Sequence, residues 1–320
     1  MPSAPALRER KLDSKLIVAF ACVYFFWGST FLAIHFAVQH FGPPMVSGLR
    51  FMLAAPPVFL LALMRKERIR VSRDELWRLI VTGLLLLVGG NVFLVWAEKT
   101  VDTGFAALVL ACIPILMTLL EVILPGGQSL PLIGWAGLVG GLVGLGVLLW
   151  PTVSAGHAQS GRIFGSMILI AGGFCWALGS VLSKRFNFKM DPFVVSAWQM
   201  LIAGVANLSI ATLAGQWHTA NWAPAGIWAI IYLAIFGSIV GFGSYAYVLH
   251  HAPVAKVATY AYVNPIVAIA LGAIFVHERL KPLEWVGMVI ILSAVAVVNT
   301  SKMRPVRTSS IHRIESPEEG

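Results

Sequence analysis

A few polar side chains lie inside the long apolar stretches of this sequence, and they are the first candidates for chemistry. Arg50 is the only arginine or lysine well inside such a stretch, about 10 Å along a helix from Pro43 at about 1.5 Å per residue. A guanidinium in apolar surroundings needs a carboxylate, carbonyl groups or a water-filled cavity beside it. Arg50 therefore either anchors an anionic group of a bound solute or forms a structural ion pair, for which Glu98 is a candidate partner.

A second group of candidates lies in the segment Ala258-Thr-Tyr-Ala-Tyr-Val-Asn-Pro265. Pro265 cannot donate a backbone hydrogen bond, so it frees a carbonyl near residue 261 and disrupts the helix there. Asn264 can satisfy the freed groups or contact a solute, and Tyr260, four residues earlier, lies on the same helical face. The pattern predicts that Asn264 and Tyr260 line a cavity, with helix–helix packing as the alternative. Pro114 precedes a comparable kink without a polar neighbour.

Aromatic residues supply the remaining candidates. Trp27 and Trp176 lie away from the ends of their apolar stretches, whereas membrane tryptophans usually gather at the interfaces. Aromatic walls suit apolar or aromatic solutes, and amines through cation–π contacts, although packing explains both residues equally well. The further candidates for lining a binding cavity are Asn91, Trp96 and Tyr245.

The composition explains why these polar residues are exceptional. Of the 320 residues, 58% are hydrophobic and only 12% are charged, with a mean hydropathy of +0.83. Soluble domains carry about 25% charged residues, so the chain is predicted to be an integral membrane protein. Its three cysteines lie in apolar stretches without metal-ligand spacing, and neither a metal nor a cofactor is expected.

Hydropathy predicts ten membrane-spanning segments, and because they are long and continuously apolar they are expected to be helices. The apolar run that begins at residue 16 is too long for a signal peptide and is interpreted as the first span. The expected spans cover residues 16–37, 44–64, 77–97, 103–124, 131–150, 163–184, 192–214, 226–249, 254–276 and 283–300.

The distribution of positive charge orients these spans. With the N-terminus in the cytoplasm, 18 of the 23 lysines and arginines fall on the cytoplasmic side, as the positive-inside rule requires. This asymmetry accounts for the net charge of +9 without a nucleic-acid partner. Residues 1–15 are then a cytosolic N-terminal segment, and the polar residues 301–320 are expected to be a disordered cytosolic tail.

Two halves of the chain repeat each other. Trp27 matches Trp176, Pro43 matches Pro192, and Arg50 corresponds to the neutral Gln199, all at an offset of 149 residues. Residues 16–150 and 151–300 therefore form two five-helix units. Because five is odd, the second unit enters the membrane in the opposite sense, which is the inverted repeat of many secondary transporters, with a binding site between the units. Gln199 joins the candidates for that site.

Several motifs, in this order and spacing, resemble the EamA-type permeases of the drug/metabolite transporter superfamily over residues 16–300. They are Trp27-Gly-Ser-Thr-Phe31, Gly48-Leu-Arg-Phe51, Gly104-Phe-Ala-Ala-Leu108 and, in the second half, Trp176-Ala-Leu-Gly-Ser180, Tyr260-Ala-Tyr-Val-Asn-Pro265 and Glu278-Arg-Leu280. The resemblance implies a transporter and favours export, and small organic metabolites such as amino acids or related compounds are the expected solutes, although the resemblance does not specify the cargo. The short loops and the lack of targeting signals indicate a bacterial inner membrane. The first half departs from it with Gln128-Ser-Leu130 where the second has Glu278-Arg-Leu280.

Two other function classes stay open beside secondary transport. A lipid-handling protein or flippase is the main alternative, and it would need a lateral opening between helices. An enzyme is not expected, because the spans contain no nucleophile–base or metal constellation and the chain lacks a Walker A sequence. The expected partners are a small-molecule substrate and the lipid bilayer; the oligomeric state is open, and a monomer is compatible with the sequence.

Overall fold

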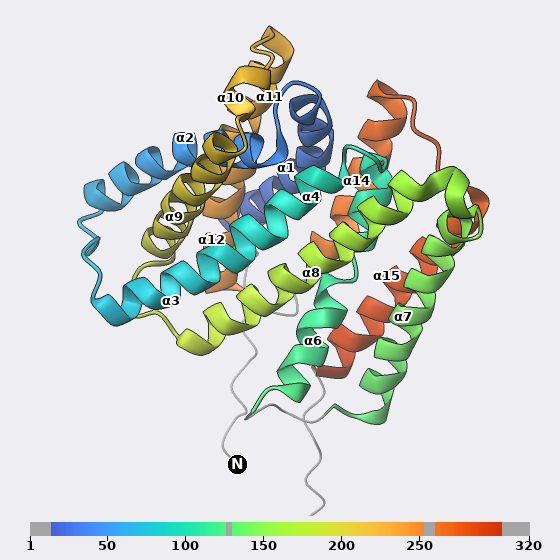
Figure 1. Cartoon of the computed structure of the whole chain (residues 1–320). Helices are drawn as coiled ribbons and strands as arrows, with labels where there is room; N and C mark the ends of the chain where they lie inside the picture. The colour runs from blue at the N-terminus through green and yellow to red at the C-terminus, as the bar shows by residue number, and fades with distance from the viewer. Residues whose placement is uncertain (1–13, 126–129, 253–259, 303–320) are drawn as a thin grey trace, which may run out of the picture.

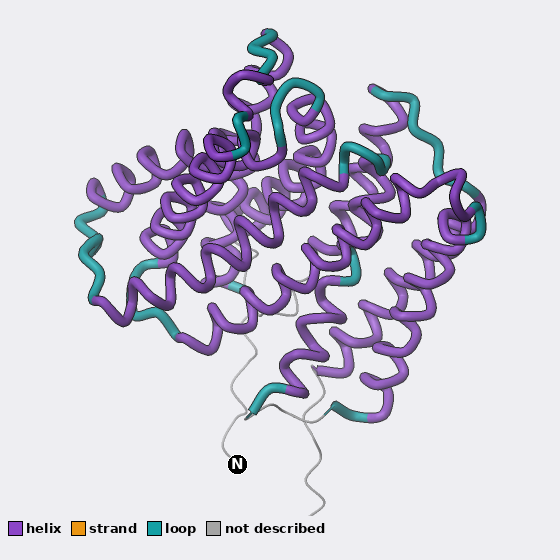
Figure 2. The backbone as a smooth tube through the Cα atoms, in the orientation of Figure 1, coloured by secondary structure: helices purple, strands orange, loops and turns teal. Residues whose placement is uncertain are grey.

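The computed structural model describes residues 14–125, 130–252 and 260–302, and in these ranges it contains helices and connections without strands (Figure 2). The predicted all-α membrane fold is thereby confirmed. Nearly all of the expected cytosolic segments 1–15 and 301–320 lies outside the described residues, as does the start of the expected span 254–276.

The first unit comprises five helical passes, some of them broken into shorter helices (Figure 1). Their bounds are α1 Ser14–Val38, α2 Pro43–Met64, α3 Arg73–Gly83 continued by the π-helix η1 Leu84–Gly90 and α4 Asn91–Ala97, α5 Thr103–Leu110 followed by α6 Ile113–Ile123, and α7 Leu132–Val153. 

The second unit repeats this order. After the short 3₁₀ helix η2 Gly156–Gln159 come α8 Ser160–Phe186, α9 Pro192–Leu213, the short α10 Gln216–Thr219, α11 Pro224–Tyr232 continued by the π-helix η3 Leu233–Val240 and α12 Gly241–His251, then α14 Tyr260–Phe275 and α15 Pro282–Lys302. A π-helix thus interrupts the third pass of each unit at corresponding positions. Such segments are rare and frequently mark functional sites.

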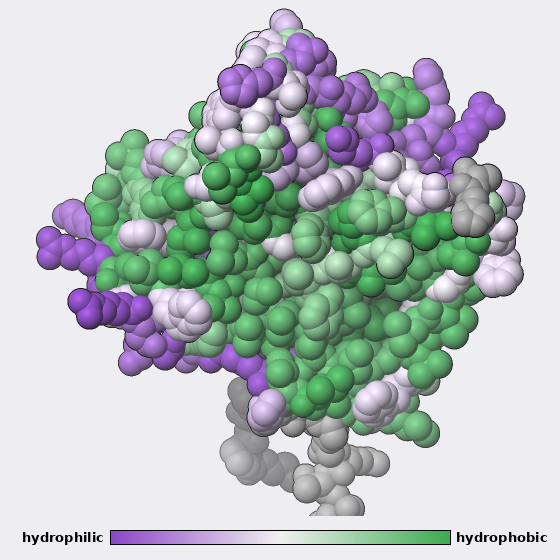
Figure 3. All heavy atoms as spheres, viewed as in Figure 1, coloured by the Kyte–Doolittle hydropathy of each residue, from purple (hydrophilic) through white to green (hydrophobic). Residues whose placement is uncertain are grey.

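Nine of the described helical segments are long and apolar enough to cross a membrane, and Tyr260–Phe275 is a shorter apolar helix. Ten passes were predicted, and these helices account for all ten. Tyr260–Phe275 is shorter than the others because the expected start of its span lies outside the described residues. The surface agrees, since apolar side chains form a broad area across the middle of the face shown in Figure 3 and polar ones gather at its top and lower left. Large hydrophobic residues such as Leu132 and Leu213 are 86% and 89% exposed, as expected for lipid contact.

The two proline-containing passes differ from each other. Near Pro114 the helix is broken between Leu110 and Ile113, and the proline occupies the first turn of α6, where it costs no hydrogen bond. Around Pro265 the helix α14 continues without a break. The expected pair of equivalent kinks is therefore realised as one helix break and one continuous helix.

The two units are packed into each other rather than side by side. The α2 helix of the first unit packs on α9 of the second, α1 packs on α14 and α12, and α4 with η1 packs on α8. The fifth helices of the two units, α7 and α15, pack closely along their length beside this centre (Figure 1). The contact between the units is therefore formed by the passes that carry most of the candidate residues.

Candidate functional site

A cavity of about 110 Å³ lies between the two units. Water needs only about 10–15 Å³ of such space per molecule, whereas pockets for drug-sized ligands span about 300–1,000 Å³. The cavity therefore suits a small solute. Its wall includes Trp27, Thr30, Arg50 and Asn91 from the first unit, and Trp176, Phe242, Tyr260 and Asn264 from the second.

Arg50 extends from α2 of the first unit to the π-helix η3 of the second. Its Nε donates a hydrogen bond of 2.8 Å to Ser238 Oγ, and its guanidinium lies 5.2 Å above the ring of Phe51. Gly237 makes room for it, because a Cβ there would lie 2.9 Å from Nη2 of Arg50. Within the described residues no carboxylate pairs with Arg50, so the structural ion pair with Glu98 is not formed. A buried cation at a cavity wall that lacks a carboxylate partner can bind an anion from solution.

Asn91 contributes a second polar group to the same wall. It lies directly after η1, and its Oδ1 accepts a 3.1 Å hydrogen bond from Ser47, one turn before Arg50 on α2. Because that bond uses only the amide oxygen, the donor –NH₂ of Asn91 remains for a solute. Arg50 and Asn91 thus place hydrogen-bond donors on one side of the cavity.

Aromatic rings form much of the rest. Trp27 and Trp176 meet edge to face with their ring centroids 6.4 Å apart, and Trp27 also contacts Phe242 at 5.5 Å and Tyr260 at 5.2 Å. Both tryptophans lie on the wall, one from each unit. An apolar or aromatic group of a solute would find complementary surfaces here.

Each of these tryptophans packs on a glycine at a π-helix boundary of the opposite unit. A Cβ on Gly241 would lie 2.5 Å from Nε1 of Trp27, and a Cβ on Gly90 would lie 3.0 Å from Cε3 of Trp176. Nε1 of Trp27 also donates a 3.2 Å hydrogen bond to the carbonyl of Gly237 in η3. The repeat relation between the tryptophans is therefore matched by a repeated contact with an irregular helix.

Asn264 and Tyr260 both reach the cavity wall. In the amide orientation that satisfies its neighbours, the Asn264 nitrogen donates to the carbonyl oxygens of Tyr260 at 3.3 Å and of Tyr24 at 3.1 Å. Asn264 thus connects α14 to α1 across the two units. Solute contact would fall to its amide oxygen.

Three candidates lie away from the wall. Trp96 is 46% exposed and does not line the cavity. Gln199 is buried, but its amide donates 2.9 Å to Thr82, so it connects α9 with α3 instead. Tyr245 lies behind Trp27, with ring centroids 5.0 Å apart. The periodicity of apolar residues along a helix predicts that one face of the helix is buried, but it does not predict which other helix packs on that face.

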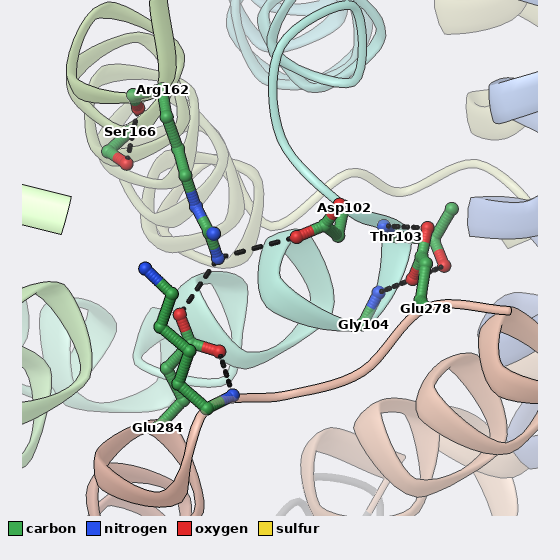
Figure 4. A network of polar contacts seen from close by, with 8 residues as sticks. Asp102, Thr103, Gly104, Arg162, Ser166, Glu278 and Glu284 are labelled. Carbon is green, nitrogen blue, oxygen red and sulfur yellow. Dashed lines mark hydrogen bonds and ion pairs between the residues drawn. The ribbon is translucent and has the colours of Figure 1, made fainter. Parts of the chain in front are cut away.

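A polar network connects the two units at the end where α4 leads into α5 (Figure 4). Glu278, in the loop between α14 and α15, accepts hydrogen bonds from Thr103 N at 2.8 Å, Thr103 Oγ1 at 2.7 Å and Gly104 N at 3.1 Å. It thereby caps the first turn of α5 in the other unit. Arg162 of α8 pairs with Glu284 at 2.8 Å and with Asp102 at 3.4 Å. We call Asp102, Thr103, Gly104, Arg162, Glu278 and Glu284 the inter-unit network.

Sequence reasoning did not find this network. Asp102 precedes α5 and has the usual residue type for a helix cap, yet its side chain makes no capping bond. The cap comes from Glu278, 175 residues later. The motif Glu278-Arg-Leu280 was a signal that the loop matters, but no local rule identifies a partner at that separation.

The opposite end of the molecule has its own contacts between the units. Lys184 at the end of α8 pairs with Glu121 of α6 at 3.1 Å, and Arg185 donates 2.8 Å to the carbonyl of Pro125. Arg78 of α3 donates 3.2 Å to the carbonyl of Phe186. In the part of the chain that the structure describes, no three His, Cys, Asp or Glu side chains gather into a potential metal site.

Comparison with known proteins relates this architecture to transporters. The model of the EamA-like transporter family matches residues 14–150 and again residues 163–300. The chain is 33% identical to the "Uncharacterized inner membrane transporter YedA" of Escherichia coli K12 over 90% of this chain and 91% of that one. It is 28% identical to the "Probable amino-acid metabolite efflux pump" of the same strain, over 85% of this chain and 90% of that one. A solved crystal structure covers 92% of this chain and 100% of its own at 22% identity, with a TM-score of 0.67, and so shares the fold.

Proposed function

The chain belongs to the EamA-like transporter family, and we propose that it is a secondary transporter of small carboxylate-bearing metabolites such as amino acids. It is a multi-pass membrane transporter, and its relatives include inner-membrane proteins. Arg50 is the observation that carries the proposal. It is a cation at the wall of a small cavity, with one hydrogen bond to Ser238 and no carboxylate partner among the described residues.

The remaining wall suggests the rest of the solute. Asn91 offers donors beside Arg50, and the rings of Trp27 and Trp176 face the same space. A carboxylate bound to the guanidinium would leave an apolar or aromatic side chain against the tryptophans. Amino acids and related metabolites combine these two groups at a size compatible with about 110 Å³.

Transport by alternating access would use the two sets of contacts between the units. The inter-unit network joins the units at one end of the molecule, and the contacts of Lys184, Arg185 and Arg78 join them at the other. Both sets are formed in the structure, and rocking of one unit against the other would break one set at a time while the other stays intact. From the positive-inside pattern we infer that the inter-unit network lies on the extracytoplasmic side and both termini in the cytoplasm. Export is the direction proposed, by analogy with the related efflux pump.

The test is transport by the purified protein in liposomes. We expect accumulation of radiolabelled amino acids to exceed that in protein-free liposomes, and to exceed that of amines and nucleosides that lack a carboxylate. A parallel assay of fluorescent-lipid flipping distinguishes the flippase alternative. Lipid flipping without solute movement would contradict the proposal, and so would transport limited to solutes without a carboxylate.

Gly241→Ala is expected to reduce transport at least about fivefold while the protein still folds. The added methyl group would displace the Trp27 ring from its hydrogen bond with Gly237 and push it into the cavity. Overpacking of this kind costs about 1–3 kcal/mol, and fivefold corresponds to about 1 kcal/mol. The matched control is Gly146→Ala, because a Cβ at Gly146 meets nothing within 4 Å. Equal initial transport rates for the two variants would show that the contact between Trp27 and Gly241 has no part in transport.

A further inference from the structure

Glu98 is a buried carboxyl group for which neither the fold nor the proposed binding site gives a reason. It follows directly after the last residue of α4 and is only 3% exposed. Neither of its carboxylate oxygens has a hydrogen-bond partner among the residues that the structure describes. An ionised carboxylate in such surroundings loses its hydration without compensation, so the neutral acid is strongly favoured.

The charged groups around it reinforce this preference. Glu278, on the α14–α15 loop, adds negative charge, and Asp102 lies four residues further along the chain.

The cations on the neighbouring helices are engaged elsewhere, since Arg162 of α8 pairs with Asp102 and Glu284, and Arg50 of α2 bonds to Ser238. His35 of α1 contacts Gln39, and Lys99 next in the chain is exposed. Burial first, and the charge of Glu278 second, raise the pKa of Glu98 well above its ordinary value.

Glu98 is also close in sequence to the inter-unit network. Only a short turn separates it from Thr103, and that turn is fixed by backbone bonds from Thr100 and Val101 to the carbonyl of Ala97. Thr103 and Gly104 in turn donate to Glu278 of the other unit. A movement that separates Glu278 from α5 would therefore change the surroundings of Glu98 at the same time, by admitting water and removing a nearby negative charge.

We propose that Glu98 is a proton-binding site, and that its protonation stabilises the closed arrangement of the inter-unit network. In the closed arrangement the carboxyl is dehydrated and holds its proton. In an opened arrangement water solvates it and it ionises at an ordinary carboxyl pKa. The closed arrangement binds the proton more tightly, so protons favour closure.

The sign of the pH dependence follows from linkage. Below the ordinary carboxyl pKa, Glu98 is protonated in both arrangements and closure does not depend on pH. Above it, and up to the raised pKa of the closed arrangement, the ratio of closed to open molecules falls about tenfold per pH unit. If the proposed transport function holds, each cycle that opens this end would release a proton there, and this consequence alone depends on that function.

The experiment uses the full-length protein in lipid and no transported solute. Infrared difference spectroscopy across a pH titration detects the C=O band of a protonated carboxyl group. We expect such a band in the wild type at neutral pH and its absence in Glu98→Gln. Hydrogen–deuterium exchange of the peptide that contains Thr103 and Gly104 reports closure, because those amides donate to Glu278. After correction for intrinsic exchange, its protection is expected to fall with rising pH in the wild type and to stay high in Glu98→Gln.

Two further variants complete the comparison. Glu278→Ala removes the acceptor and is expected to lose the protection of this peptide at every pH. Glu67→Gln changes a carboxyl outside the network, in the connection between α2 and α3, and should behave as the wild type. If wild type and Glu98→Gln give the same infrared spectra at neutral pH, Glu98 is ionised at that pH and the proposal is overturned. The same pH dependence of protection in both proteins would also overturn it. Neither result bears on whether the protein transports amino acids, which the liposome assay decides separately.

Discussion

Replacement of Arg50 by alanine is expected to lower the transport of carboxylate-bearing solutes at least about tenfold, with little effect on solutes that lack a carboxylate. Hydrogen bonds to charged groups contribute about 1.5–3 kcal/mol, which corresponds to about 10- to 150-fold in affinity. The alanine variant removes the cation from the cavity wall, and no other described residue of that wall is charged. The measurement is the initial rate of uptake into liposomes for an amino acid and for its decarboxylated amine, compared for each variant.

Two companion variants separate charge from geometry. Arg50→Lys keeps the positive charge but lacks the planar fork, so an intermediate rate is expected. Ser238→Ala keeps the guanidinium but removes the hydroxyl oxygen that accepts the hydrogen bond from Nε, so it should reduce transport less than Arg50→Ala. Thermal unfolding in detergent establishes that each variant is folded. If folded Arg50→Ala carries amino acids at the wild-type rate, Arg50 is structural and the site must be sought around Asn264 and the tryptophans.

Gly287→Ala is expected to be the most destabilising of the conservative substitutions, because it separates two closely packed helices. A Cβ on Gly287 of α15 would lie 2.7 Å from the backbone nitrogen and 2.8 Å from the Cα of Leu148 in α7. Backbone atoms cannot rotate away as a side chain can, so the helices must move apart. Close backbone approach at small residues is a main source of stability between membrane helices. The expected loss is about 1–3 kcal/mol or more, measured as a lower midpoint of thermal unfolding.

Gly146→Ala is the matched control on the same helix pair, since both substitutions add one methyl group to a helical glycine. It faces open space and should leave stability unchanged or raise it by up to about 1 kcal/mol through helix propensity. Equal midpoints for the two variants would mean that α7 and α15 are not held at the observed distance.

Much of the fold could be predicted because a membrane restricts it. Apolar runs long enough to cross a bilayer must form helices, so composition and run length predicted an all-α membrane protein. The repeat of Trp27 at Trp176 and of Pro43 at Pro192 predicted two related units at residues 16–150 and 151–300, and the family model matches residues 14–150 and 163–300. Arg50, Asn91, Tyr260 and Asn264 were identified because a polar group in apolar surroundings requires a reason.

The same reasoning could not decide which neighbours those residues meet. Trp96 and Gln199 have suitable types at suitable depths, yet the rotation of their helices directs the first outward and the second toward Thr82. The helix continues through Pro265, and Asn264 donates to the carbonyl of Tyr24 on a different helix, a contact that no local pattern identifies.

What the sequence alone determined were properties that each segment has by itself: its helical state, its length, its repeat partner and its unusual polar residues. The tertiary structure alone decided which segments contact each other in space. Glu278 caps α5 across 175 residues, Arg50 bonds to Ser238 across 188, and Glu98 is buried without a hydrogen bond from any described residue to its carboxylate. Local periodicity reports how a residue relates to its own helix axis, whereas the cavity, the inter-unit network and the buried acid depend on how helices from two units are placed against each other.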